Sequence, residues 1–135
     1  MGRIRVLLVD ESNDFVDGLS AWLTGQEGMG IVWMAHRRDE AIAAADRLAP
    51  DLIVLDARTP PSGGFDAARR LRERHPAAVI VITSIHVSAA ARWAAVEAGA
   101  DYFMEKSAVA TDIDDIVRRI RGRHDKRENE ERRQS

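Results

Sequence analysis

Leu52-Ile53-Val54-Leu55 is a run of four aliphatic residues that stops abruptly at Asp56. A run this short, with no polar alternation, is typical of a strand whose two faces are both buried in a parallel sheet. Val79–Ile82 is a run of the same kind, and so is Ile4–Val9 apart from Arg5; each is followed by polar residues. Two weaker runs complete a set of five predicted strands: Ile31–Ala35 and Tyr102–Met104.

Segments with apolar residues at helical spacing separate these runs, which predicts strands and helices in strict alternation. A doubly wound α/β domain follows, with a five-stranded parallel sheet, right-handed crossovers and helices on both faces. This pattern leaves the strand order open. The predicted helices are Phe15–Leu23, Asp39–Leu48, Phe65–Arg74, a segment from Ser88 to Gly99, and a fifth helix capped by Thr111.

The composition is that of an ordinary globular chain of one domain. It has 135 residues, of which 45% are hydrophobic and 31% charged, and it contains no cysteine. Disulfides, thiolate nucleophiles and cysteine-bound metals are therefore excluded. The sequence contains neither an apolar stretch of about 20 residues nor a signal peptide, so we expect a cytoplasmic protein that does not contact membranes.

The net charge of −2 is unevenly distributed along the chain. Residues 118–135 carry eight Arg or Lys and four acids, so the preceding residues carry a net charge of −6. A body this acidic is a poor nucleic-acid binder, and we expect no direct binding to nucleic acid. Residues 122–135 lack an apolar stripe, which predicts a charged tail that is a helix extension or disordered and does not dock on the body.

Polar residues follow the strongest strands at the point where each strand ends. Asp10-Glu11 follows the first strand, Asp56 the third and Thr83 the fourth, while Lys106 comes after the fifth. Ligands of open parallel sheets bind at the carboxyl ends of the strands. Three acids, a hydroxyl and a lysine are therefore predicted at one edge of one sheet.

Here the sequence resembles the response-regulator receiver domain, the phospho-acceptor module of two-component signalling. The resemblance covers about residues 3–121 and implies a flavodoxin-like fold with strand order 2-1-3-4-5. It is carried by four blocks in family order: Leu8-Val9-Asp10-Glu11, Asp51–Asp56 with Pro60 and Gly64, Val81-Ile82-Thr83-Ser84, and Ala98–Lys106.

The resemblance implies a role for each of these polar residues. Asp56 would accept a phosphoryl group from a histidine kinase or a phosphotransfer protein, as carboxylates do elsewhere. Lys106 and Thr83 would contact the phosphoryl oxygens, and Thr83 and Phe103 would form the switch.

A magnesium ion would complete the site, because clustered carboxylates need a counter-charge and Mg²⁺ prefers carboxylate oxygens. Asp10, Glu11 and Asp56 would hold it, together with the backbone carbonyl of Arg58.

The sequence departs from the family pattern in the last loop. Ser107 follows Lys106, where many receivers have a proline in a cis linkage, so the turn to the last helix must be made differently. Arg58 and Ile85 occupy variable positions that, in this family, tune the attack of water on the phosphoryl group. We expect these two side chains to shield it.

We therefore expect residues 1–121 to form a receiver domain and 122–135 to follow as a tail. The expected activity is not enzymatic, apart from slow self-dephosphorylation. Phosphorylation would change the surface of the fourth helix, fifth strand and fifth helix, for a downstream protein target or a homodimer. The alternative is the receiver half of a helix-turn-helix transcription regulator, although only 14 residues follow Arg121, too few for such a domain.

Overall fold

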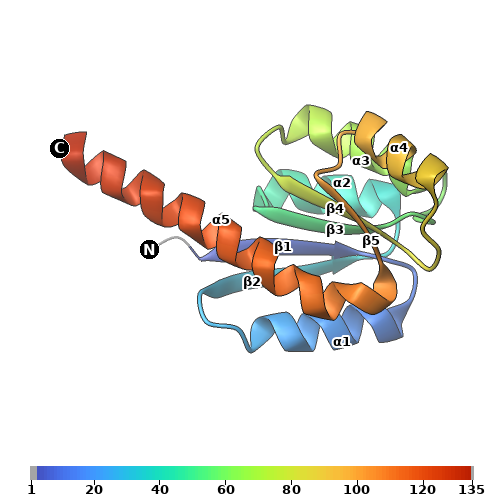
Figure 1. The fold of residues 1–135 in the computed structure, drawn as a ribbon, viewed down its shortest axis with the longest axis horizontal. Helices are drawn as coiled ribbons and strands as arrows, with labels where there is room; N and C mark the ends of the chain where they lie inside the picture. The colour runs from blue at the N-terminus through green and yellow to red at the C-terminus, as the bar shows by residue number, and fades with distance from the viewer. Residues whose placement is uncertain (1–2, 135) are drawn as a thin grey trace.

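A computed structural model describes residues 3–134 as one parallel sheet covered by helices on both faces (Figure 1). The strand order is β2-β1-β3-β4-β5, which confirms the fold class and the order implied by the family resemblance. The strands are β1 (Ile4–Val9), β2 (Met29–Ala35), β3 (Leu52–Asp56), β4 (Val79–Ser84) and β5 (Tyr102–Glu105). The helices are α1 (Asn13–Thr24), α2 (Arg38–Leu48), α3 (Gly64–Arg74), α4 (Ala89–Glu97) and α5 (Lys106–Gln134).

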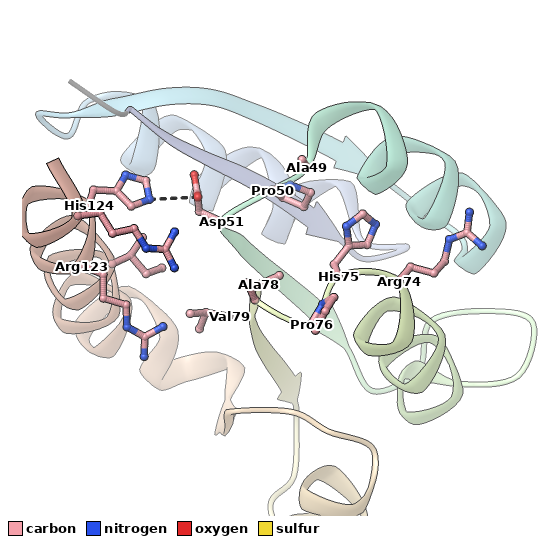
Figure 2. Close-up of a pocket in the computed structure, with 13 residues that line it drawn as sticks. Ala49, Pro50, Asp51, Arg74, His75, Pro76, Ala78, Val79, Arg123 and His124 are labelled. Carbon is pink, nitrogen blue, oxygen red and sulfur yellow. Dashed lines mark hydrogen bonds and ion pairs between the residues drawn. The ribbon is translucent and has the colours of Figure 1, made fainter. Parts of the chain in front are cut away.

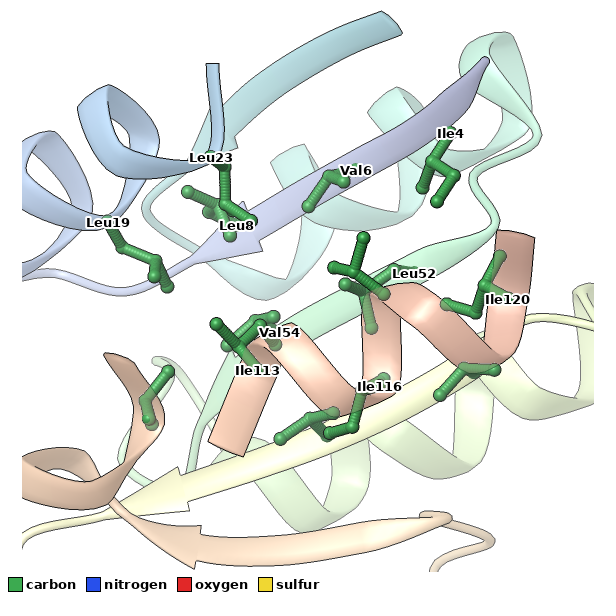
Figure 3. Close-up of a cluster of buried hydrophobic side chains, with 14 of the residues drawn as sticks. Ile4, Val6, Leu8, Leu19, Leu23, Leu52, Val54, Ile113, Ile116 and Ile120 are labelled. Atoms are coloured by element: carbon green, nitrogen blue, oxygen red, sulfur yellow. The ribbon is translucent and has the colours of Figure 1, made fainter. Parts of the chain in front are cut away.

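The aliphatic strands divide their side chains between two core layers, because successive residues of a strand point to opposite faces. On β3, Leu52 and Val54 enter the layer under α1 and α5, while Ile53 and Leu55 enter the layer under α2, α3 and α4. Large side chains of α1 and α5 fill the first layer, as Figure 3 shows for Leu23, Ile113 and their neighbours. Alanines dominate the helix side of the second layer, namely Ala41, Ala44, Ala45, Ala67, Ala68 and Ala95.

The last helix differs from its sequence prediction at its start. Thr111 does not cap it, because α5 begins at Lys106, directly after β5. Val109 explains the earlier start: it is buried in the same core layer as Ile113, four residues later, and so extends the inward stripe by one turn.

The same helix continues without interruption to Gln134, so residues 122–134 are helical and project beyond the sheet (Figure 1). At 1.5 Å per residue, its 29 residues span about 44 Å. No helix within residues 3–134 is long and apolar enough to cross a membrane.

Gly64 allows α3 to begin against the end of β3. A Cβ atom at this position would lie 2.2 Å from the backbone oxygen of Asp56 and 2.8 Å from the Cα of Ala57. The Gly64 N–H instead donates to the Ala57 carbonyl at 2.8 Å. Any larger residue would push the helix away from the strand end that carries Asp56.

Candidate functional site

Three polar side chains lie buried at the carboxyl edge of the sheet. Asp10 directly follows β1, Asp56 ends β3, and Thr83 pairs in register with Asp56 on β4. All three are less than a tenth exposed, and they are the only buried polar residues of 3–134 apart from Thr59. The structure therefore brings together side chains that the sequence placed at separate strand ends.

Lys106 supplies the positive charge among these acids. Its Nζ lies 2.5 Å from Asp10 Oδ2 and 3.4 Å from Asp56 Oδ1. The same ammonium lies 4.8 Å from the centre of the Phe15 ring, in cation–π contact. Because α5 begins at Lys106, the side chain comes from the first residue of the helix, and no proline turn is needed to direct it to the acids.

Two oxygens at this edge are buried without a hydrogen bond from any residue of 3–134: Asp10 Oδ2 and Thr83 Oγ1. Asp10 Oδ1 accepts from the Ser12 N–H at 2.8 Å, whereas Oδ2 has only its ionic contact with Lys106. Buried oxygens are hydrogen-bonded in most native proteins, and each exception needs an explanation. A ligand that offers charge or oxygens at this edge would provide one.

Burial raises the pKa of Asp56 above its ordinary value, and the negative charge of Asp10 raises it further. Lys106 and the Arg58 backbone N–H oppose the shift by favouring the ionised carboxylate. The carboxylate is thus held in an environment with too little positive charge, so an additional cation would stabilise it.

Two of the predicted ligands, Asp10 and Asp56, are placed where they could bind a magnesium ion. Asp10 and Asp56 offer two carboxylates, and Mg²⁺ in proteins takes one or two together with waters and phosphate oxygens. Glu11 is exposed, and no three His, Asp or Glu side chains within residues 3–134 gather closely enough to hold a metal ion. The role of Glu11 as a third carboxylate ligand stays a prediction. The role of the Arg58 carbonyl stays a prediction.

Thr59 is a buried residue of this edge that the sequence analysis did not single out. Its hydroxyl donates to the Asp56 backbone carbonyl at 2.6 Å, and its N–H donates to the same oxygen at 3.1 Å. Its own carbonyl accepts from the Gly63 N–H at 2.8 Å. Thr59 thus fixes the turn that carries Asp56. A threonine just before a proline was the available signal, because hydroxyl residues close such turns.

Arg38 ties the same turn to the neighbouring loop. Its N–H donates to the Pro60 carbonyl at 2.8 Å, and its guanidinium donates to Ser62 at 3.0 Å and Asp66 at 3.1 Å. The loop after β3 is therefore anchored from the start of α2.

Phe103, the predicted switch aromatic, lies half-buried on β5. Its ring packs against the core layer under α2, α3 and α4, with its centre 6.4 Å from that of Phe65. Phe103 pairs in register with Ile82, the residue before Thr83. The structure thus places Phe103 and Thr83 on neighbouring strands, one position out of register.

Comparison with known proteins gives a consistent result. The family model for the response regulator receiver domain matches residues 6–121. A protein-glutamate methylesterase/protein-glutamine glutaminase from Methanospirillum hungatei is 38% identical over 72% of this chain, and the match covers 28% of that protein. The response regulator GacA of Pseudomonas viridiflava is 28% identical over 87% of this chain and 55% of its own length. The chain thus spans about half, or less, of these curated relatives.

Among solved structures, one similar protein is a response regulator from Burkholderia pseudomallei with a phosphorylated aspartic acid and a calcium ion. It is 27% identical, with a TM-score of 0.70 over 76% of this chain and 59% of its own.

Proposed function

Because this chain belongs to the response regulator receiver domain family and is a phospho-acceptor of that kind, we propose that Asp56 is its acceptor residue. The observation that carries the proposal is the buried carboxylate of Asp56 with Lys106 Nζ at 3.4 Å and Thr83 beside it on β4. The donor would be the phosphohistidine of a histidine kinase or a phosphotransfer protein in the cytoplasm.

In the transfer, a carboxylate oxygen of Asp56 attacks phosphorus while the bond from phosphorus to the donor nitrogen breaks, and the imidazole leaves. Lys106 neutralises one phosphoryl oxygen, and the unpaired Thr83 hydroxyl donates to another. Asp10 and Asp56 would hold a magnesium ion, which supplies positive charge for the phosphoryl oxygens. This chain's own residues therefore position the acceptor and offset its charge, which is most of what phosphoryl transfer requires.

The new phosphoryl group would act as a switch through Thr83 and Phe103. Its oxygens offer the Thr83 hydroxyl the partner that it lacks, so a shift of Thr83 toward Asp56 leaves space that the half-buried Phe103 can fill. The surface of α4, β5 and α5 would then change between two populated states. Trp93 and Val96 on α4 are already about two-thirds exposed and would contact a protein target.

We expect no enzymatic activity beyond slow loss of the phosphoryl group. The match to the methylesterase relative covers only 28% of that protein, so most of the relative has no counterpart in this chain.

Acetyl phosphate with Mg²⁺ tests the acceptor directly. Intact-mass measurement should show one added phosphoryl group on the wild type and none on Asp56→Asn. Asp17→Asn, at an exposed position of α1, is the matched control and should label normally. Equal labelling of Asp56→Asn and wild type would overturn the assignment.

A further inference from the structure

A cleft of about 300 Å³, shown in Figure 2, lies at the edge of the sheet where β3 and β4 begin. Its walls come from the residues before β3, the loop between α3 and β4, and one face of α5. Asp51 lines it and immediately precedes β3, whereas Asp56 ends that strand. The cleft is therefore separate from the phospho-acceptor site, by the length of one strand.

The inward face of α5 changes from apolar to cationic where it reaches this cleft. Ile116 and Ile120 are buried in the core. The next positions on the same helical face, Arg123, His124 and Arg127, line the cleft instead. Figure 2 shows Arg123 and His124 on the wall formed by α5, with His124 directed at Asp51.

This contact corrects the expectation that nothing in residues 122–135 docks on the body. His124 Nε2 lies 3.1 Å from Asp51 Oδ1, and both side chains are about four-fifths buried. Asp51 also accepts from the Arg5 N–H at 2.9 Å. The first turn of the extension is thus held at the cleft by a polar contact that no apolar stripe could have signalled.

Most acids near the cleft are already engaged. Asp46 contacts both Arg74 and His75, which form the opposite wall, and Asp51 is engaged by His124. Arg123 and Arg127 have no ion pair with any residue of 3–134. Their separation of four residues also makes them like-charge neighbours on the helix, which is unfavourable.

Arg118, five residues before Arg123 on α5, provides the contrast. It pairs with Asp114 at 2.8 Å, as Arg70 and Arg72 of α3 pair with Asp66 and Asp101. The guanidiniums of Arg123 and Arg127 therefore lie over a cleft whose nearby acids already have partners. Their positive charge favours binding of an anion there.

The residues that line the cleft indicate which class of anion it would bind. Pro50, Pro76, Val79 and Ile120 give it an apolar surface beside the two arginines. We propose that the cleft binds a small organic phosphate of the nucleoside monophosphate class. Its phosphate would lie between Arg123 and Arg127, whose planar donor groups match phosphate oxygens, and its base would lie against the prolines. The volume is at the lower end for small-molecule sites, which suits such a ligand better than a protein segment.

Adenosine and guanosine monophosphate are the probes, titrated at constant ionic strength into the full chain carrying Asp56→Asn. A chelator keeps Mg²⁺ away, so the phospho-acceptor edge cannot contribute. NMR shifts of the His75 and His124 rings report on the cleft, and calorimetry gives the affinity. At least one nucleotide should bind more tightly than adenosine or guanosine and inorganic phosphate, with shifts confined to cleft residues.

Arg123→Ser/Arg127→Ser should weaken that binding at least tenfold. The control is Lys126→Ser/Arg133→Ser, which removes the same charge from the same helix outside the cleft and should leave the affinity unchanged.

The proposal is overturned by no saturable binding of either nucleotide, by equal loss in both double variants, or by equal affinity for inorganic phosphate. Tighter binding of duplex DNA that weakens equally in both double variants would show general polyanion attraction by α5 and would also overturn it.

Discussion

At the carboxyl edge of the sheet two buried oxygens have no hydrogen bond from any residue of 3–134, whereas at the amino edge one arginine donates to four backbone carbonyls. The Arg72 guanidinium donates to the carbonyls of His75, Pro76, Ala78 and Gly99 and to the Asp101 carboxylate. Asp101 in turn accepts from the Ile80 N–H at 2.9 Å. The backbone groups of the loops before β4 and β5 therefore have partners within the protein, whereas two buried side-chain oxygens at the carboxyl edge have no hydrogen bond within residues 3–134.

This difference separates stability from function. Arg72 and the carbonyls that it reaches are saturated, so they fix the loops before β4 and β5 and are not themselves available to a ligand. Within residues 3–134, Thr83 Oγ1 has no hydrogen bond and Asp10 Oδ2 has only its ion pair with Lys106, so a charge arriving at Asp56 can reorganise them. The carboxyl edge therefore lowers the stability of the fold, and it is also the edge that can rearrange when Asp56 is phosphorylated.

Arg72→Ala should give the largest loss of stability. Four carbonyls and a carboxylate lose a donor, so we expect the free energy of unfolding to fall by about 2–4 kcal/mol in a urea titration. Arg70→Ala on the same helix removes a half-exposed guanidinium that pairs with Asp66, and should cost less than about 0.5 kcal/mol. Equal losses for the two variants would mean that Arg72 is not the anchor of this edge.

Asp56→Asn should stabilise the metal-free protein at neutral pH, by roughly 1–2 kcal/mol, the scale of an uncompensated buried polar group. The folded pKa of Asp56 is raised, so its ionisation costs stability at every pH above the unfolded pKa, and fully above the folded pKa. The advantage of Asn should shrink as pH falls through the raised pKa and vanish below about 3.9. Urea titrations from pH 3.5 to 8 measure it.

Asp66→Asn should change the free energy of unfolding in the opposite direction from Asp56→Asn. The Ser62 hydroxyl and Arg38 hold the pKa of Asp66 below its ordinary value. Its charge therefore contributes stability above the unfolded pKa, and Asn should destabilise at neutral pH. If both variants shift stability in the same direction, the contrast between open and closed acids fails.

The features of these two edges that depend on local sequence could be predicted, whereas those that depend on contacts between distant residues could not. Short aliphatic runs such as Leu52–Leu55 identified the strands, because burial on both faces leaves a continuous pattern. The strand order required the family resemblance. Asp10, Asp56, Thr83 and Lys106 could be placed at one edge because strand ends alone determine it.

Contacts between distant segments could not be predicted. Thr59 closes the turn by a hydrogen bond to a backbone oxygen, and Arg72 reaches carbonyls up to 27 residues away. The contact of His124 with Asp51 joins residues 73 positions apart. The start of α5 at Lys106 was missed for a local reason, since Thr111 is a good capping residue but the buried Val109 extends the helix.

The smallest effect should come from the end of α5. His124→Ala removes the contact with Asp51, but Asp51 keeps the Arg5 N–H, so no carboxylate is left buried and unpaired. We therefore expect this variant, and a truncation after Arg121, to lower the free energy of unfolding by less than about 1 kcal/mol. His86→Ala, at an exposed loop position, is the control and should change nothing. A loss above about 2 kcal/mol on truncation would show that the amino edge needs α5 beyond Arg121 to be closed.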